Sequence, residues 1–231
     1  MGRRAESIIS LLRKLKEVET LSIGELRDIV GDSELFELLV AMGHSDLGCQ
    51  RVSFNLESRF EISSLALECG VDVEEVCKLL SWREFESFSK SVLEKNNYSC
   101  IQNFRFKINQ KRYEIDVVGV KEPLILCIDS KHYRKTSKHF VLIKCCEKQV
   151  ERIEAFSRAL PKMVPKLGIT KWKEAKIIPL IVTLLTEEIA SLKVPIVPFF
   201  KLNSFIMDLP SYLSDLYHIN VKLSKLEDYV P

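Results

Sequence analysis

The sequence predicts a mixed α/β protein with a mostly helical region at its N-terminal end. Three observations support this: apolar residues recur at helical spacing over much of residues 1–80, residues 112–119 alternate like a half-buried strand, and residues 124–128 form an unbroken apolar run typical of a fully buried strand. With 231 residues, 46% of them hydrophobic, the chain can bury one large core or two small ones. We therefore divide it into a helical domain, residues 1–80, and a second domain, residues 81–231.

The N-terminal domain carries the marks of several helices. Residues 4–19 form an amphipathic pattern with one apolar stripe, made of Ile8, Leu11, Leu12 and Leu15. Two further segments begin like capping boxes, in which a side-chain oxygen and a glutamate three residues later satisfy free N–H groups: Ser22-x-x-Glu25 and Asp72-x-x-Glu75. We expect a helix to begin at each of these places.

Residues 58–69, Gly70 and residues 72–80 have the outline of a helix-turn-helix, which would suit a DNA-recognition module. Where contacts to phosphates or bases would lie, the second helix begins with three carboxylates: Asp72, Glu74 and Glu75. We therefore favour ordinary helix packing or a protein interface over insertion into a major groove. One nearby stretch, residues 52–56, has the alternation of a strand without an obvious partner strand, so it is either a strand or a loop.

The alternating segment in the second domain predicts a strand that leads into a hairpin. On a regular strand its side chains divide between two faces: Tyr113, Ile115 and Val117 on one, and Glu114, Asp116 and Val118 on the other. Residues 120–123 look like a turn, because Pro123 fixes φ and lacks an N–H. If the connection is symmetric about Glu122 and Pro123, Asp116 lies directly opposite Asp129, with Cβ atoms roughly 5 Å apart.

The buried apolar run continues into Asp129-Ser130-Lys131. Residues i and i+2 of a strand point to the same side, so the charges of Asp129 and Lys131 leave the sheet together. The carboxylates of Asp116 and Asp129 repel each other unless a cation lies between them, and Mg²⁺ prefers carboxylate oxygens. A lysine beside such an ion can hold or deprotonate an attacking water and stabilise charge developing on phosphorus. The alternative is a structural ion pair of Lys131 with Glu114, with Asp129 in water.

This arrangement resembles the PD-(D/E)xK nuclease superfamily, which includes restriction endonucleases of the Mrr type and archaeal Holliday-junction resolvases. The matching residues are Asp116 for the first acid and Asp129-x-Lys131 for the second motif. The resemblance implies a restriction-endonuclease-like αβββαβ core and a phosphodiesterase that depends on Mg²⁺, for which Mn²⁺ can substitute. It is specific over residues 82–158.

The sequence upstream of the hairpin extends the resemblance. Ser81-Trp82-Arg83-Glu84 has the form of a capping box and opens a helix with apolar residues at helical spacing. Superfamily members often carry a glutamate on this helix as an extra metal or water ligand, which makes Glu86 a candidate; a solvent-facing glutamate is the alternative. Residues 100–108 complete the order of one helix and three strands.

Downstream, we expect a helix over residues 140–160, a buried strand over residues 176–185, a further strand over residues 195–200 and a helix over residues 204–216 broken by Pro210. In some relatives a glutamine on the helix after the second motif contributes to the site, which makes Gln149 a candidate. One subgroup has a tyrosine four residues after this glutamine, and this chain has Ile153 there.

The charge is divided unevenly between the two domains. Residues 1–80 hold 9 Lys and Arg against 15 Asp and Glu, a balance of −6, and residues 81–231 hold 25 against 17, a balance of +8. Basic and polar residues that follow the proposed metal site would grip a polyanionic backbone. The candidates for binding nucleic acid are His132, Tyr133, Arg134, Lys135, Lys138, Lys148 and Gln149.

These residues predict a metal-dependent DNA endonuclease in which Asp116, Asp129 and Glu86 hold Mg²⁺ and Lys131 positions water. Restriction, repair and the processing of junctions or flaps remain open. The alternative is a non-catalytic nucleic-acid-binding protein that keeps the nuclease fold and recruits a partner through its N-terminal helices. Cutting two strands often takes two such sites, so a homodimer is also considered.

The sequence gives no sign of a membrane or an oxidising compartment. Its apolar runs are shorter than the ~20 residues of a membrane helix, and the first residues contain no apolar core of a signal peptide. The seven cysteines contain no C-x-x-C pair, which fits buried thiols in a reducing compartment. We therefore expect a cytoplasmic protein.

Overall fold

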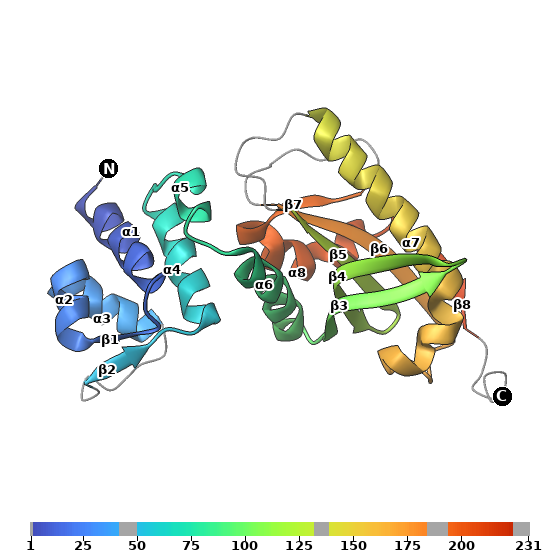
Figure 1. Ribbon diagram of the computed structural model, residues 1–231, viewed down its shortest axis with the longest axis horizontal. Coiled ribbons are helices and arrows are strands. Elements are labelled where there is room, and N and C mark those ends of the chain that lie inside the picture. The colour runs from blue at the N-terminus through green and yellow to red at the C-terminus, as the bar shows by residue number, and fades with distance from the viewer. Residues whose placement is uncertain (1, 42–49, 132–138, 184–193, 224–231) are drawn as a thin grey trace. The chain divides into compact units, whose positions relative to one another are not determined.

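The chain divides into two compact units, Met1–Glu84 and Phe85–Pro231. The computed structural model describes residues 2–41, 50–131, 139–183 and 194–223. Each unit has a hydrophobic core of its own, and the elements of both are labelled in Figure 1. The sequence places the division a few residues earlier, after residue 80.

The first unit is mostly helical. Its elements, in chain order, are α1 (Arg3–Leu15), β1 (Thr20–Ser22), α2 (Ile23–Val30), α3 (Asp32–Ala41), β2 (Arg51–Ser53), α4 (Leu56–Glu68) and α5 (Val73–Cys77). The apolar stripe of α1 lies in the core, as its spacing predicts: Ile8, Leu11, Leu12 and Leu15 are all at most 2% exposed. The core therefore forms because α1, α2 and α4 turn their apolar faces toward one another.

The alternating stretch that follows α3 is a strand, β2, and its partner is β1. The two pair antiparallel, with Leu21 opposite Val52 and both side chains buried. The partner has only three residues and lies at the start of a capping box. So short a strand has no detectable alternation of its own, and its pairing is visible only in the fold.

The helix starts predicted from capping boxes are confirmed. At α2 the N–H of Glu25 donates to Ser22 Oγ at 3.2 Å, and the N–H of Ser22 donates to Glu25 Oε2 at 2.8 Å. At α5 the N–H of Glu75 donates to Asp72 Oδ1 at 3.3 Å. Each cap satisfies donors that the first turn of a helix leaves free.

The outline of a helix-turn-helix corresponds to α4, a turn at Gly70 with φ of 80°, and α5. The second helix has only five residues, less than two turns. Two of its acidic residues have structural partners, because Asp72 caps it and Glu75 pairs with Arg13 of α1 at 2.5 Å. These contacts support helix packing rather than insertion into a major groove.

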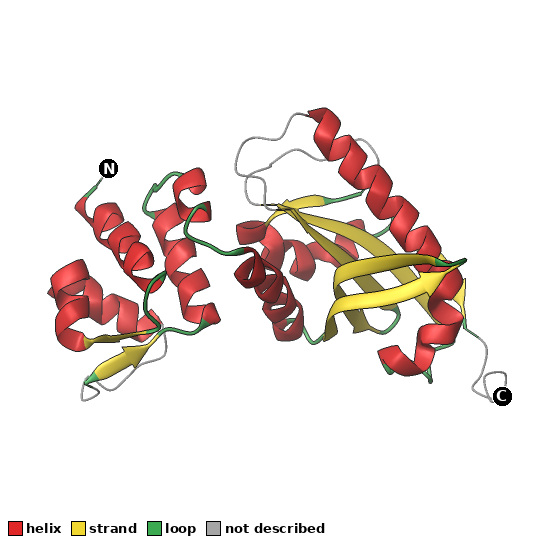
Figure 2. Cartoon of the chain, in the orientation of Figure 1, coloured by secondary structure: helices red, strands yellow, loops and turns green. Residues whose placement is uncertain are grey.

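The second unit is a mixed α/β fold around a central sheet, shown in yellow in Figure 2. Its elements are α6 (Trp82–Lys95), β3 (Ser99–Ile108), β4 (Lys111–Lys121), β5 (Leu124–Lys131), α7 (His139–Leu167), β6 (Glu174–Thr183), β7 (Ile196–Pro198), a 3₁₀ turn (Phe199–Lys201), α8 (Leu202–Tyr212) and β8 (Ile219–Lys222). The strands lie in the order β3-β4-β5-β6-β7, and β8 pairs with the other half of β6.

The sheet is mixed, because β3, β4 and β5 are antiparallel neighbours whereas β5, β6 and β7 run parallel. The predicted hairpin register is confirmed over five pairs, from Val117 opposite Ile128 to Lys121 opposite Leu124. The turn is thus symmetric about residues 122 and 123. The pairing of β4 with β5 ends at Val117, so Asp116 and Asp129 lie just beyond the last pair rather than in the pair that the sequence predicts.

The prediction of two regular faces on β4 is wrong at Val118. Ile115 and Val118 lie in the same core, although residues three apart on a regular strand point to opposite sides. The pairing of β3 with β4 skips Asn103 and Asp116, and Asn103 has a φ of 50°. This irregularity shifts the alternation by one residue, and asparagine tolerates the left-handed backbone that it needs.

Helices cover both faces of the sheet (Figure 1). Long helix α7 packs over one face, where its Phe156 lies in a core with Phe104 and Ile115. On the other side, Phe85 of α6 contacts Phe199 edge-to-face at 6.0 Å between ring centres. Leu93, further along α6, approaches β4 at Gly119, where an added Cβ would lie only 2.7 Å from Leu93 Cδ1.

Replacing Gly119 by Ala is therefore expected to destabilise the protein by about 1–3 kcal/mol, because Leu93 is fully buried and has little room to move. Urea denaturation followed by circular dichroism measures this. Gly24→Ala is the matched control, since a Cβ there would meet only Ser22 Oγ, at 3.9 Å. Equal unfolding free energies for Gly119→Ala and the wild type would contradict the close approach of α6 to the sheet.

The downstream elements follow the predicted order with shifted ends. Helix α7 continues past residue 160 through Pro161 and Pro165, because Val164 and Leu167 remain in the core and packing offsets the missing N–H groups. Pro210 lies within α8 rather than breaking it. Strand β8 has no counterpart in the prediction. None of the described helices is long and apolar enough to cross a membrane.

Candidate functional site

The site forms where β4 and β5 stop pairing. Asp129 follows the buried run of β5 and is 3% exposed, although it carries a carboxylate. Two cations compensate it: Lys131 Nζ lies 2.6 Å from Oδ2, and Arg152 Nη1 of α7 donates to Oδ1 at 2.8 Å. The prediction that Asp129 and Lys131 leave the sheet on one side is confirmed by their direct contact.

The ion pair considered as an alternative, between Lys131 and Glu114, does not occur. Lys131 pairs with Asp129, and Glu114 accepts from Arg105 Nε at 2.8 Å instead. The alternative also required Asp129 to be in water, but its side chain is buried. The charges at this end of the sheet thus form a compact network rather than a pair at its rim.

Gln149 belongs to the interior of this network, which corrects its assignment to the nucleic-acid surface. Its side chain is fully buried, and Nε2 donates to the carbonyl of Cys127 at 2.7 Å. Its Oε1 accepts from Arg152 Nη1, the nitrogen that also binds Asp129. Gln149 therefore fixes the guanidinium of Arg152 against the strand and cannot reach a bound polymer.

Arg152 is the residue that sequence reasoning missed as part of the site. It lies one helical turn after Gln149, on the same face of α7. The sequence signal for its role was a glutamine and an arginine three residues apart, on the helix that follows the strand of Asp129. Burial of the acid also required a second cation, because an unpaired buried charge is strongly unfavourable.

Asp116 lies beside this network. Its Oδ2 accepts from the backbone N–H of Ser130 at 2.7 Å, so the side chain takes a place that the regular pairing of β4 with β5 has left. Burial raises the pKa of Asp116 to about 6, and the negative charges of Asp129 and Glu86 add to the rise. The hydrogen bond from Ser130 and the charge of Lys131 oppose it. The carboxylates are thus close enough to repel.

Glu86 lies on α6 and is half-buried. Its negative charge contributes to the raised pKa of Asp116, but less than burial and Asp129 do. Among the residues that the structure describes, no three His, Cys, Asp or Glu side chains gather closely enough to hold a metal ion. The side chains in this conformation therefore bring two carboxylates together, with the third at longer range.

The donors present fit a hard divalent cation. They are carboxylate oxygens, which Mg²⁺ prefers, and one or two protein carboxylates are its usual complement. The raised pKa of Asp116 reflects burial and repulsion that a cation between Asp116 and Asp129 would relieve. Asp116 and Asp129 are the residues that would hold such an ion, with Glu86 as a further oxygen donor.

The raised pKa leads to a prediction for the metal-free protein. Asp116→Asn is expected to be more stable than the wild type above about pH 6, by about 1–2 kcal/mol after allowance for partial exposure of the side chain. The wild type loses stability as the pH rises from about 4 to about 6, since its unfolded state ionises first. Asparagine does not ionise, so its variant has no such loss. The difference in stability between the variant and the wild type should therefore vanish below about pH 4.

Urea denaturation in EDTA at both ends of this pH window measures the difference. Asp208→Asn, at an exposed position of α8, is the matched control and should follow the wild type throughout. A stability difference for Asp116→Asn that is the same at low and high pH would contradict the raised pKa of Asp116.

Most of the other predicted binding residues lie outside the described residues. This applies to His132, Tyr133, Arg134, Lys135 and Lys138. Lys148 is exposed on α7, one turn before Arg152. Its side chain is therefore accessible from solvent, and its role in binding nucleic acid stays a prediction.

Comparison with known proteins finds an archaeal relative. No known family profile matches the chain. A protein of Archaeoglobus fulgidus, described as uncharacterized, is 30% identical over 138 residues, which are 59% of this chain and 97% of the archaeal protein. The fold and site thus define an α/β protein with a buried carboxylate network. The chain belongs to the same family as this archaeal protein.

Among solved structures, a crystal structure of a protein from Vibrio cholerae covers 91% of this chain with a TM-score of 0.36 and 13% sequence identity. The chain spans about half of that protein, 52% of its length. A likeness this weak supports no argument about fold or activity.

Proposed function

We propose that the second unit is a metal-dependent DNA endonuclease with a restriction-endonuclease-like core of the PD-(D/E)xK type. The observation that carries the proposal is the convergence of Asp116, Asp129 and Lys131 at one point of the sheet. Two strands and an irregularity in β4 are needed to bring them together, and burial makes the arrangement costly. The order α6, β3, β4, β5, α7, β6 is consistent with such a core.

In this proposal Asp116 and Asp129 hold Mg²⁺, with Glu86 as a third oxygen donor. The ion would supply charge stabilisation at the scissile phosphate and lower the pKa of a bound water. Arg152 keeps Asp129 oriented through Oδ1, and Gln149 braces Arg152. Lys131 orients the attacking water and stabilises negative charge that develops on the phosphate.

The second candidate is a non-catalytic nucleic-acid-binding protein. One observation favours it: both carboxylate oxygens of Asp129 already have cationic partners, so the network is neutralised without a metal. The acidic first unit would then recruit a protein partner. A homodimer and a cytoplasmic location belong to both proposals.

Activity and metal binding distinguish the two. Calorimetric titration of the full chain with Mg²⁺, and with Mn²⁺ as a substitute, would measure metal binding. Cleavage would be assayed on duplex, single-stranded, flap and junction DNA with either ion and with EDTA. We expect saturable metal binding and cleavage that EDTA removes. Binding of DNA without metal binding or cleavage of any substrate would favour the non-catalytic candidate.

A further inference from the structure

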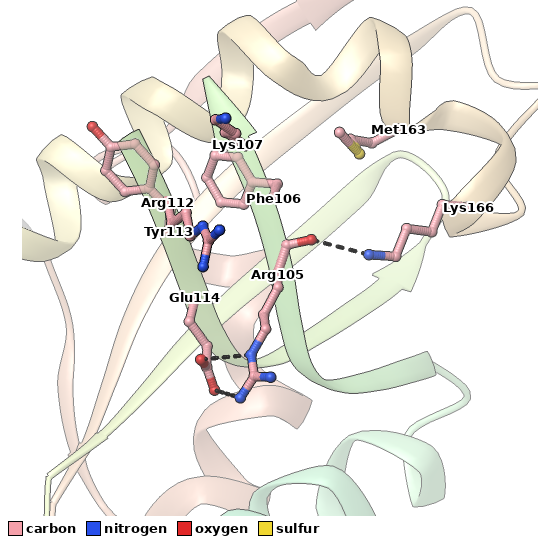
Figure 3. Close-up of a pocket in the computed structure, with 8 residues that line it drawn as sticks. All are labelled: Arg105, Phe106, Lys107, Arg112, Tyr113, Glu114, Met163 and Lys166. Atoms are coloured by element: carbon pink, nitrogen blue, oxygen red, sulfur yellow. Dashed lines mark hydrogen bonds and ion pairs between the residues drawn. The ribbon is translucent and has the colours of Figure 1, made fainter. Parts of the chain in front are cut away.

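A second group of cations lies at the turn end of the β3–β4 hairpin, several residues along β4 from Asp116. Side chains of β3, β4 and the end of α7 line an open groove there of about 820 Å³ (Figure 3). Four of them are cations: Arg105, Lys107, Arg112 and Lys166. The acid in the lining is Glu114.

Lys107 and Arg112 lie directly opposite each other in the antiparallel register. Like charges in this position repel and weaken a hairpin. Both are exposed, and neither side chain forms a hydrogen bond or an ion pair within the described part of the chain. Glu114 does not neutralise them, since both of its oxygens accept from Arg105, at 2.8 and 3.4 Å. Two juxtaposed cations are thus left without an anion.

Other lining groups have contacts of their own beside these two cations. Lys166 Nζ donates to the carbonyl of Arg105 at 3.0 Å and lies 4.1 Å from the centre of the Phe104 ring, so its ammonium is fixed at the edge of the sheet. The rings of Phe106 and Tyr113 stack, with centres 5.2 Å apart and planes 11° from parallel. Figure 3 shows Lys166 and the two stacked rings with the other residues that line the groove. Phe106 and Tyr113, which adjoin Lys107 and Arg112 in the sequence, are therefore held by their stacking contact.

We propose that this groove binds phosphates of the nucleic-acid strand that enters the Asp116 site. The identity of the polyanion rests on the proposed function. Arg112 lies four residues before Asp116 on β4, so their Cα atoms are roughly 13 Å apart. A strand of duplex DNA rises about 3.4 Å per nucleotide. The groove thus holds the backbone about four nucleotides from the point of cleavage, and Lys107 and Arg112 contact it without reading sequence.

The test uses the full-length double variant Lys107→Gln with Arg112→Gln. The control is Lys171→Gln with Lys173→Gln, which removes the same charge from exposed positions outside the groove. Fluorescence anisotropy in EDTA measures the affinity for a labelled duplex over a salt series. The groove variant is expected to lower the slope of log K against log salt by about 1.8, or 0.9 for each lost phosphate contact, and the control to leave it nearly unchanged.

Folding of the groove variant is checked by thermal denaturation without DNA. It is expected to melt no earlier than the wild type, since the change removes two opposed cations. Equal salt slopes for the two double variants, or a wild type that does not bind nucleic acid, would overturn the groove assignment. Binding of an acidic peptide in place of nucleic acid would also overturn it.

Cleavage is measured separately with Mg²⁺, so the two proposals fail in different ways. If the wild type binds DNA through the groove but never cleaves it, the groove assignment stands and the endonuclease proposal fails. If the wild type cleaves DNA and the groove variant binds and cleaves equally well, the endonuclease proposal stands and the groove assignment fails.

Discussion

Replacing Asp129 by Asn is expected to reduce Mg²⁺-dependent cleavage by roughly 10³-fold or more, because it removes a ligand of the proposed ion and several kcal/mol of charge stabilisation. The same change should destabilise the fold. Lys131 and Arg152 would lose the anion that compensates them, and both side chains are partly buried, 27% and 21% exposed. We expect a loss of about 1–3 kcal/mol, less than for a fully buried pair.

Asp116→Asn is the matched comparison, since it removes the other proposed metal ligand. It should abolish cleavage to a similar extent but stabilise the metal-free protein at neutral pH, for the reason given by its raised pKa. Single-turnover cleavage with Mg²⁺ and urea denaturation in EDTA measure the two effects. Near-wild-type cleavage by either variant would contradict the metal site. If both variants were stabilised, or both destabilised, the different surroundings that the structure gives to the two acids would be contradicted.

The contrast between these two acids shows what the sequence can predict about the site. The hairpin register follows from Pro123 and the lengths of the flanking strands, and it correctly places Asp116 near Asp129. It gives no sign, however, that the two acids have different partners. The difference arises from Arg152 of α7, which contacts Asp129 although it lies 23 residues further along the chain. The spacing of Gln149 and Arg152 on one helix face hints at such a contact, but only the fold shows that this face meets Asp129.

The irregularity in β4 was not predictable for a similar reason. Regular alternation assigns Val118 to the face of Asp116, but the structure places Val118 in the core with Ile115. The shift depends on Asn103 of the neighbouring strand, whose left-handed φ interrupts the pairing. An exposed asparagine in a strand is a weak signal when read alone, because its partner residue must be known.

The helical first unit was the easier part to predict. Its capping boxes and the apolar stripe of α1 are local signals, and the structure confirms them. The β1–β2 pair was harder to predict, because β1 has only three residues. A strand this short has no alternation to detect. Short pairs of this kind are held by the surrounding core rather than by intrinsic strand preference.

Lys131→Ala is expected to slow the chemical step by a factor on the order of 10² or more, with binding of Mg²⁺ and DNA largely kept. The reason is geometric. Lys131 is the more exposed of the two cations on Asp129, and it follows that acid by two residues on the same side of β5. Its ammonium would therefore face a water or phosphate oxygen at the proposed ion on Asp129. Arg152 still compensates the carboxylate in the variant, so the fold should persist.

Single-turnover rates at saturating DNA separate chemistry from binding, which is measured by anisotropy in EDTA. Lys148→Ala is the matched control, because Lys148 is an exposed lysine on α7 without a contact to Asp129 among the described residues. It should lower DNA affinity slightly and leave the saturated rate unchanged. If Lys131→Ala instead weakens DNA binding but reaches the wild-type rate at saturation, Lys131 serves to grip phosphate rather than to stabilise charge in the transition state. The ion pair with Asp129 would then be a resting contact of the metal-free protein, and the catalytic role would have to lie with another residue near Asp116.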